Sequence, residues 1–239
     1  MLRPSLTIFS LLLATAAALP AGTLSSQHAN HLETRSSCAT QAEQVTNGSD
    51  TNGRGVQLEN GDSQSRSFFV YANSCDSIPL QYVTLSAGQD AFISLPQGFQ
   101  GRIVRGTTDV NLDGQPHLLG TWLEIGFDAN DAMGYADVSL IRGCDGAVTV
   151  AAMDGTGAST GFTQDVLSGA PDDALQANDA GAMVIKATEG LLSAIVSASR
   201  DYLASVLGYD KAYIDDFHGN PVIASNNQRF SATFYAGKA

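Results

Sequence analysis

Residues 120–141 read Gly-Thr-Trp-Leu-Glu-Ile-Gly-Phe-Asp-Ala-Asn-Asp-Ala-Met-Gly-Tyr-Ala-Asp-Val-Ser-Leu-Ile, and they are the clearest indication of a β fold. Polar and apolar side chains alternate around Glu124, which is typical of a strand with one polar face. Two runs of strand length, 121–127 and 135–141, are separated by a short polar segment. The pattern predicts two neighbouring strands, on which Glu124 and Asp137 can take facing positions.

Runs of the same length recur along the rest of the chain. They occupy 68–71, 80–85, 91–95, 102–104, 148–152, 221–224 and 229–235. Turn-forming pairs such as Asp113-Gly114 and Asp145-Gly146 lie between them. Short apolar runs separated by turn residues predict a mainly β protein, an antiparallel β-sandwich.

Three segments depart from this pattern of short apolar runs. Residues 38–64 are rich in Asn, Gly and Ser, so any strand there should be short. Residues 154–179 are polar and have no period, which predicts a loop or lobe. Over 180–207, apolar residues recur at helical spacing, which predicts one long helix. Asn178 or Asp179 can cap its start, Gly208 can end it, and Gly190 can interrupt it.

The N-terminal residues are typical of a secretory leader. Arg3 precedes a largely apolar run at 6–19, and small residues near Ala21 offer cleavage sites. The run is shorter than the roughly 20 residues of a membrane-spanning helix. We therefore expect a signal peptide at 1–21, a polar leader or pro-segment at 22–37, and secretion to the exterior or the cell wall.

The remaining residues 38–239 are expected to form a single domain, which is a plausible size for one β-rich core. Within it, 66–153 and 212–239 should build the sandwich, and 154–211 a smaller lobe of loop and helix. The sequon at Asn47, in a polar region, predicts glycosylation.

The charge of the chain excludes several classes of partner. There are 24 acidic and 12 basic residues, for a net charge of −12. Such a surface repels phosphate backbones and anionic lipid, so we expect neither nucleic acid nor membrane partners. Neutral glycans or cationic ligands fit better. The sequence has no phosphate-binding loop, no serine-hydrolase elbow and no zinc signature, so we expect no cofactor and no metal.

The cysteines should form disulfides in an oxidising compartment. The three cysteines, Cys38, Cys75 and Cys144, allow three single pairings and leave one thiol over. Because Cys75 and Cys144 both fall inside the predicted sandwich, we favour that pair, without excluding the others.

Three stretches of the sequence resemble the thaumatin-like family. The first is Phe68-Phe69-Val70-Tyr71-Ala72-Asn73-Ser74-Cys75 with Leu85-Ser86-Ala87-Gly88-Gln89 and Gln100-Gly101-Arg102-Ile103. The second is Gly120-Thr121-Trp122-Leu123-Glu124-Ile125 with Tyr135-Ala136-Asp137-Val138-Ser139-Leu140-Ile141-Arg142-Gly143. The third is Ala212-Tyr213-Ile214-Asp215-Asp216 with Phe230-Ser231-Ala232-Thr233-Phe234-Tyr235. Their order agrees with that family, and the resemblance implies a thaumatin-like sandwich.

The chain also departs from that family. Tyr235 stands where the family has its closing cysteine, and the cysteine-rich second lobe is replaced by the predicted loop and helix. A cysteine-poor microbial member, of fungal type, is the nearer comparison.

The resemblance implies an acidic cleft that binds or slowly hydrolyses β-1,3-glucan. Glu124 and Asp137 match two of the family's acids, and they are the candidate catalytic pair. Independently, a glycosidase needs two carboxyl groups about 5 Å apart when retaining, or about 6.5–9.5 Å when inverting. Facing strand positions allow either separation. Apolar neighbours Trp122, Ile125 and Phe127 are expected to raise the pKa of Glu124, as a general acid requires.

Other residues are candidates for ligand binding in this cleft, and each has a structural alternative. Asp128 and Asp131 can supply further acids or serve as turn residues. Arg102 and Arg105 can hydrogen-bond cleft carboxylates or form structural salt bridges. His117 can donate to a ligand or be a surface loop residue.

The leading hypothesis is a secreted thaumatin-like protein that binds cell-wall β-1,3-glucan and has at most weak endo-β-1,3-glucanase activity. The rival hypothesis is a non-catalytic secreted effector or surface protein that binds a protein of the host or cell surface.

Overall fold

The computed structural model describes residues 38–46, 48–128, 130, 133–190 and 192–239. The predicted signal peptide and pro-segment, the sequon residue Asn47 and the candidate Asp131 lie outside these residues.

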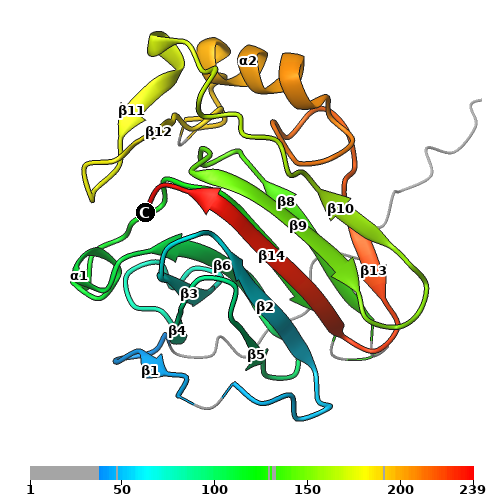
Figure 1. Cartoon of the computed structure of the whole chain (residues 1–239). Helices are drawn as coiled ribbons and strands as arrows, with labels where there is room; N and C mark the ends of the chain where they lie inside the picture. The colour runs from blue at the N-terminus through cyan, green and yellow to red at the C-terminus, as the bar shows by residue number, and fades with distance from the viewer. Residues whose placement is uncertain (1–37, 47, 129, 131–132, 191) are drawn as a thin grey trace, which may run out of the picture. The chain divides into compact units, whose positions relative to one another are not determined.

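Most of the described strands belong to two sheets (Figure 1). The strands of the first are β1 (Glu43–Gln44), β3 (Arg66–Ala72), β4 (Gln81–Leu85), β6 (Gln100–Gly106), β7 (Trp122–Phe127), β8 (Gly134–Ser139) and β13 (Ile223–Ser225). Their spatial order in this seven-stranded sheet is β1-β4-β3-β6-β7-β8-β13.

The second sheet has five strands. They are β2 (Gly55–Gly61), β5 (Asp90–Ser94), β9 (Gly146–Ala152), β10 (Ser159–Gly161) and β14 (Arg229–Gly237). Their spatial order is β10-β9-β14-β2-β5, with β14 (red in Figure 1) between β9 and β2.

The remaining elements are small. They are the hairpin of β11 (Leu175–Ala177) and β12 (Met183–Ile185), a 3₁₀ turn at Asp172–Ala174, and the helices α1 (Thr108–Asn111) and α2 (Ser197–Leu207).

The core forms where one face of each sheet is apolar. Phe68 and Leu123 of the seven-stranded sheet and Leu58 and Phe230 of the five-stranded sheet belong to one buried cluster. The rings of Phe68 and Phe234 lie 5.0 Å apart, which joins β3 to β14. Alternation along each strand places these side chains inward and polar ones outward. The mainly β sandwich predicted from the sequence is confirmed, with one helix longer than a single turn in the described part.

The sheets are mixed, whereas the sequence predicted an antiparallel sandwich. Strand β14 pairs in parallel with β2 over the whole of 229–235, and antiparallel with β9 on its other side. Strand β1 pairs in parallel with β4. Parallel neighbours need a long connection, and here most of the chain separates β2 from β14.

The expectation that residues 38–64 hold only a short strand is wrong. β2 spans seven residues, and its Val56 and Leu58 are completely buried. Two apolar residues are enough for β2 to form, because β5 and β14 pair with it on its two sides. Strand neighbours from distant parts of the sequence leave no local pattern.

The predicted long helix over 180–207 is also wrong in its first half. Val184 lies in β12, and the chain then closes a loop in which Val196 N donates to Thr188 O at 2.8 Å. Within that loop Ser193 adopts a positive φ of 56°. The helix α2 therefore begins only at Ser197. Its predicted end is confirmed, because Gly208 follows it with a φ of 70°.

The disulfide joins Cys38 to Cys75, so the favoured pairing of Cys75 with Cys144 is wrong. Cys144 is free and completely buried, and burial raises the pKa of its thiol to about 12. Cys144 packs in the core beside Thr121, whose hydroxyl contacts its sulfur at 3.5 Å. Disulfides of this kind form in oxidising compartments.

Of the helices in the described residues, none combines the length and apolar character needed to cross a membrane.

Candidate functional site

A row of polar side chains crosses the outer face of the seven-stranded sheet. Tyr71 of β3 pairs with Arg102 of β6, Arg102 pairs with Glu124 of β7, and Glu124 pairs with Asp137 of β8. Partners directly opposite one another project to the same face, with Cβ atoms about 4.5–5.5 Å apart. The two candidate carboxyl groups therefore lie side by side, as the alternating pattern predicted. Their catalytic role stays a prediction.

Arg102 is the cation of this row. It is only 2% exposed, and its guanidinium stacks on two rings, 4.0 Å from the centre of Trp122 and 4.8 Å from that of Tyr71. It forms an ion pair with Asp76 at 2.8 Å. Its Nε has no hydrogen-bond partner among the described residues. Arg102 thus places a fixed positive charge beside Glu124.

Asp137 is the carboxyl group of the row that has an unsatisfied oxygen. Its Oδ1 is buried and has no hydrogen-bond partner within the described residues. Burial, and after it the negative charge of Glu124, raises the pKa of Asp137 to about 8. A carboxyl group with such a pKa keeps its proton at neutral pH.

Burial also raises the pKa of Glu124, but several neighbours oppose the rise. A hydrogen bond from Ser139 and the charge of Arg102 both stabilise the carboxylate. When two adjacent carboxyl groups have different surroundings, their pKa values move apart, so that one group keeps its proton while the other ionises. Here Asp137 is the proton holder. The sequence predicted that role for Glu124, partly from Ile125 and Phe127, but those two side chains are buried in the opposite, inner face.

The chain returns to β8 at two points and leaves a loop beside Asp137. Tyr213 N donates to Val138 O at 2.8 Å, and Leu140 N donates to Tyr213 O at 2.7 Å. Ile223 pairs with Ala136. Residues 214–222 connect these two contacts on the side of β8 away from Glu124. The loop thus forms a border of the site.

This border adds charge and aromatic surface. The charge of Asp216 helps to raise the pKa of Glu124. Burial raises the pKa of Tyr213, and the charges of Asp137 and Glu124 add to that rise. Phe217 is 66% exposed, and Tyr135 on β8 is 42% exposed. The sequence identified Tyr213 and Asp216 only as part of a motif. Their approach to Asp137 depends on the backbone hydrogen bonds of Tyr213 with Val138 and Leu140, which are distant in sequence, so no local pattern signals it.

Arg105 does not join the site, contrary to expectation. It pairs with Phe68, whose side chain is in the core, so it projects to the inner face. Its guanidinium lies 5.8 Å from the ring centre of Phe234. Burial raises the pKa of Asp145, and the charge of Arg105 partly opposes that rise.

Asp128 is a turn residue, as its structural alternative predicted. Its Oδ1 accepts the backbone N–H of Asn130, and its carbonyl accepts from Gln228. It lies directly after the last residue of β7, outside the strand that carries Glu124.

His117 is held by other residues of its own region. Nδ1 contacts Asp179 at 2.7 Å and Nε2 contacts Asp113 at 3.0 Å. Burial lowers its pKa, but these two carboxylates outweigh that effect and raise it. His117 therefore links two loops through these carboxylates and is not a free donor.

No metal site accompanies these acids in the described part of the chain, where no group of three or more His, Cys, Asp or Glu side chains converges. What the row offers chemically is a carboxyl group that is protonated at neutral pH, an adjacent carboxylate, a fixed cation and exposed aromatic rings.

Comparisons with known proteins do not assign a family. No protein-family model matches the chain, and no curated protein matches it. Among solved structures, it is similar to the crystal structure of the protein elicitor MoHrip2 from Magnaporthe oryzae, at 16% sequence identity and a TM-score of 0.36. That match covers 46% of this chain and 78% of the other. The thaumatin-like family indicated by the sequence motifs is not confirmed by these comparisons.

Proposed function

We propose that the protein is secreted and binds a neutral glycan of cell walls, β-1,3-glucan, on the outer face of the seven-stranded sheet. The observation that carries the proposal is the facing pair Glu124 and Asp137, of which Asp137 has a pKa of about 8. Buried carboxyl groups with strongly raised pKa values cluster at functional sites, because acids and bases there need pKa values matched to their task. A structural surface pair would be expected to sit in water or with hydrogen-bond donors.

The chemistry of the pair suits a glycan. A protonated Asp137 donates a hydrogen bond, an ionised Glu124 accepts one, and sugar hydroxyl groups do both. The exposed rings of Tyr135 and Phe217 offer apolar faces at the border. The net charge of −12 disfavours anionic ligands and leaves neutral sugars as the better fit.

Weak hydrolysis is the finer part of the proposal. In it, Asp137 is the general acid that protonates the leaving oxygen, and Glu124 is the nucleophile or the base. The charge of Arg102 favours the ionised form of Glu124 next to its protonated neighbour. The Cys38–Cys75 disulfide and the predicted leader at 1–21 support secretion.

A sedimentation assay on insoluble β-1,3-glucan, combined with an assay of released reducing sugar, tests both parts. The variants are Glu124→Gln and Asp137→Asn, and Asp90→Asn serves as a control for loss of an exposed acid on the other sheet. We expect wild type and Asp90→Asn to bind and both site variants to bind weakly and release no sugar. Equal binding by all four proteins would contradict this site.

The rival function, a secreted effector that binds a protein partner, is favoured by one observation. The exposed rings of Tyr135 and Phe217 are the side-chain type that concentrates binding energy in protein interfaces. Failure of wild type to bind any wall glycan would exclude our proposal and favour this rival.

A further inference from the structure

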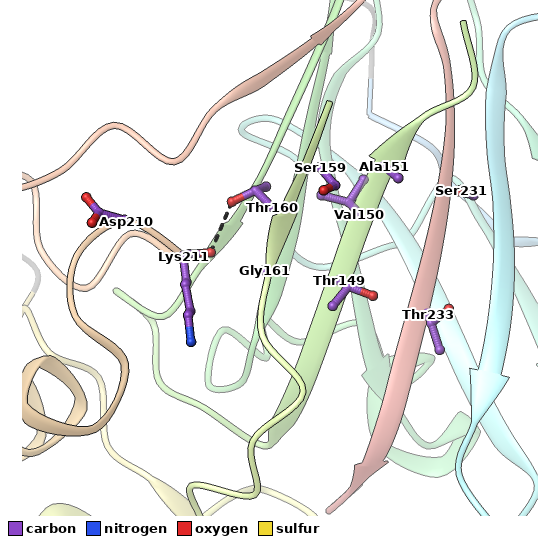
Figure 2. Close-up of a pocket in the computed structure, with 10 residues that line it drawn as sticks. All are labelled: Thr149, Val150, Ala151, Ser159, Thr160, Gly161, Asp210, Lys211, Ser231 and Thr233. Atoms are coloured by element: carbon purple, nitrogen blue, oxygen red, sulfur yellow. Dashed lines mark hydrogen bonds between the residues drawn. The ribbon is translucent and has the colours of Figure 1, made fainter. Parts of the chain in front are cut away.

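A second polar depression lies on the outer face of the five-stranded sheet, on the opposite side of the core from Glu124 and Asp137. Its volume is about 360 Å³, and Figure 2 shows its lining on β9, β10, β14 and the residues after α2. Ligand sites in proteins commonly measure about 300–1,000 Å³. We call this depression the hydroxyl groove.

Small side chains make the floor of the hydroxyl groove. Ser159 pairs with Ala151 and Ala151 with Ser231, so these three form one row across three strands. Gly161, Thr149 and Thr233 form the next row. Neither row contains a side chain larger than threonine, and this is why the face is hollow.

The hydroxyl groups of the groove fall into two kinds. Thr149 shares a hydrogen bond with the Tyr235 hydroxyl at 3.3 Å, and Thr233 donates to Glu59 at 2.9 Å. Ser159 and Ser231 have no side-chain hydrogen bond to any described residue. The first pair has fixed orientations, while the second pair is free to donate to or accept from a ligand.

One wall of the groove is held rigidly. The carbonyl of Lys211 accepts from Gly161 N at 3.0 Å and from the Thr160 hydroxyl at 3.2 Å. The ammonium of Lys211 and the carboxylate of Asp210 lie on this side of the groove, as Figure 2 shows. Neither forms an ion pair within the described part of the chain. One cation and one anion leave the groove without net charge.

These features define a ligand class. An uncharged groove that carries hydroxyl groups, one carboxylate and one ammonium complements a neutral molecule with many hydroxyl groups. The lining contains no aromatic ring on which a sugar could stack, so we expect hydrogen bonds to orient the ligand. We infer that the hydroxyl groove is a second glycan site, which binds a short neutral oligosaccharide independently of the Glu124–Asp137 pair.

A glycan polymer that meets both sites would be bound more tightly than either site alone permits, provided that it can reach both. The second site needs no catalysis and no change in the protonation of Asp137.

Titration of the ¹⁵N-labelled protein, followed by amide NMR, tests the inference. The probes are soluble β-1,3-gluco-oligosaccharide, mannan-derived oligosaccharide and chitin oligosaccharide, with inorganic phosphate as an anionic probe. We expect at least one oligosaccharide to shift the amides of 149–151, 159–161 and 231–233. The double variant Glu124→Gln/Asp137→Asn lacks the first site and should give the same shifts as wild type. The groove is therefore tested separately from the proposed function.

The variant Ala151→Trp fills the groove floor with an outward-facing ring, and we expect it to weaken binding by at least tenfold. Gln176→Trp on exposed β11 is the matched control and should bind normally. If Ala151→Trp does not fold, Ser159→Ala/Ser231→Ala should weaken binding about three- to tenfold, since it removes hydrogen bonds without steric change. No shift with any oligosaccharide, shifts only with phosphate, or shifts unchanged in these variants would overturn the inference.

Discussion

The outer faces of the two sheets satisfy their polar groups in different ways. On the seven-stranded sheet, Arg102, Glu124 and Asp137 form a charged row that is largely withdrawn from water, and one oxygen of Asp137 has no partner in the described residues. On the five-stranded sheet, the groove presents small hydroxyl groups such as Ser159 and Ser231 to solvent. We expect the first face to reduce the stability of the fold and the second to be nearly neutral for stability.

The largest effect is expected from the disulfide, which anchors the charged face. Cys75 directly precedes Asp76, the ion-pair partner of Arg102. The bridge closes a separation of 37 residues, and the double variant Cys38→Ser/Cys75→Ser should lose about 4 kcal/mol of unfolding free energy because the unfolded chain gains entropy. Urea unfolding measures this. A loss below about 1 kcal/mol would show that the bridge does not stabilise this face.

Removal of a cation should affect the two faces very differently. Arg102→Met leaves Glu124 and Asp76 without their counter-charge, and should cost roughly 3 kcal/mol. Lys211→Met at the groove is the matched control and should change stability by less than about 0.5 kcal/mol. The same denaturation experiment compares them. Equal effects would contradict the difference between the two faces.

Asp137→Asn is expected to stabilise the protein at high pH. The pKa of Asp137 is raised to about 8 in the folded state from its ordinary value of 3.8, so folding favours the protonated form. This contribution to stability is fully present below pH 4 and is lost as the pH rises toward 8. The variant should therefore match wild type near pH 4 and become progressively more stable than wild type as the pH rises to 8. Thermal unfolding across this range measures the gap, and a gap independent of pH would contradict the raised pKa.

The smallest effect is expected at the groove. Ser231→Ala removes a partly exposed hydroxyl that has no hydrogen bond to a described residue, so the free energy of unfolding should change by less than about 0.5 kcal/mol at any pH. Urea unfolding at pH 5 and pH 8 checks this. A larger loss would mean that this face also carries structural polar contacts.

Local pattern allowed part of this molecule to be predicted from its sequence. The alternation around Glu124 predicted its strand, and neighbouring strands predicted that Asp137 faces it. The same period of two explains the error at Arg105, since positions three apart in a strand project to opposite faces. Arg102 and Arg105 therefore cannot share a site on β6.

Non-local pairing explains the remaining differences. β2 is buried by strands from distant parts of the chain, so its weak apolar pattern did not indicate a central strand. The pairing of Cys75 with Cys38 depends on the position of residue 38 in the folded protein, which the spacing of the cysteines does not indicate. The half of the predicted helix before Ser197 forms a strand and a closed loop, because contacts with Ile141 and Cys144 satisfy its backbone. Tyr213 and Asp216 reach the site through similar distant contacts.

Carboxyl ¹³C NMR titration of Asp137 tests the central claim most directly, namely that Glu124 and Asp137 form a coupled, water-poor pair. The pair should show one carboxyl group that titrates near pH 8, and Glu124→Gln should lower that value because a neighbouring charge is removed. Titration of Asp137 near its ordinary value of about 4 in both proteins would contradict the account.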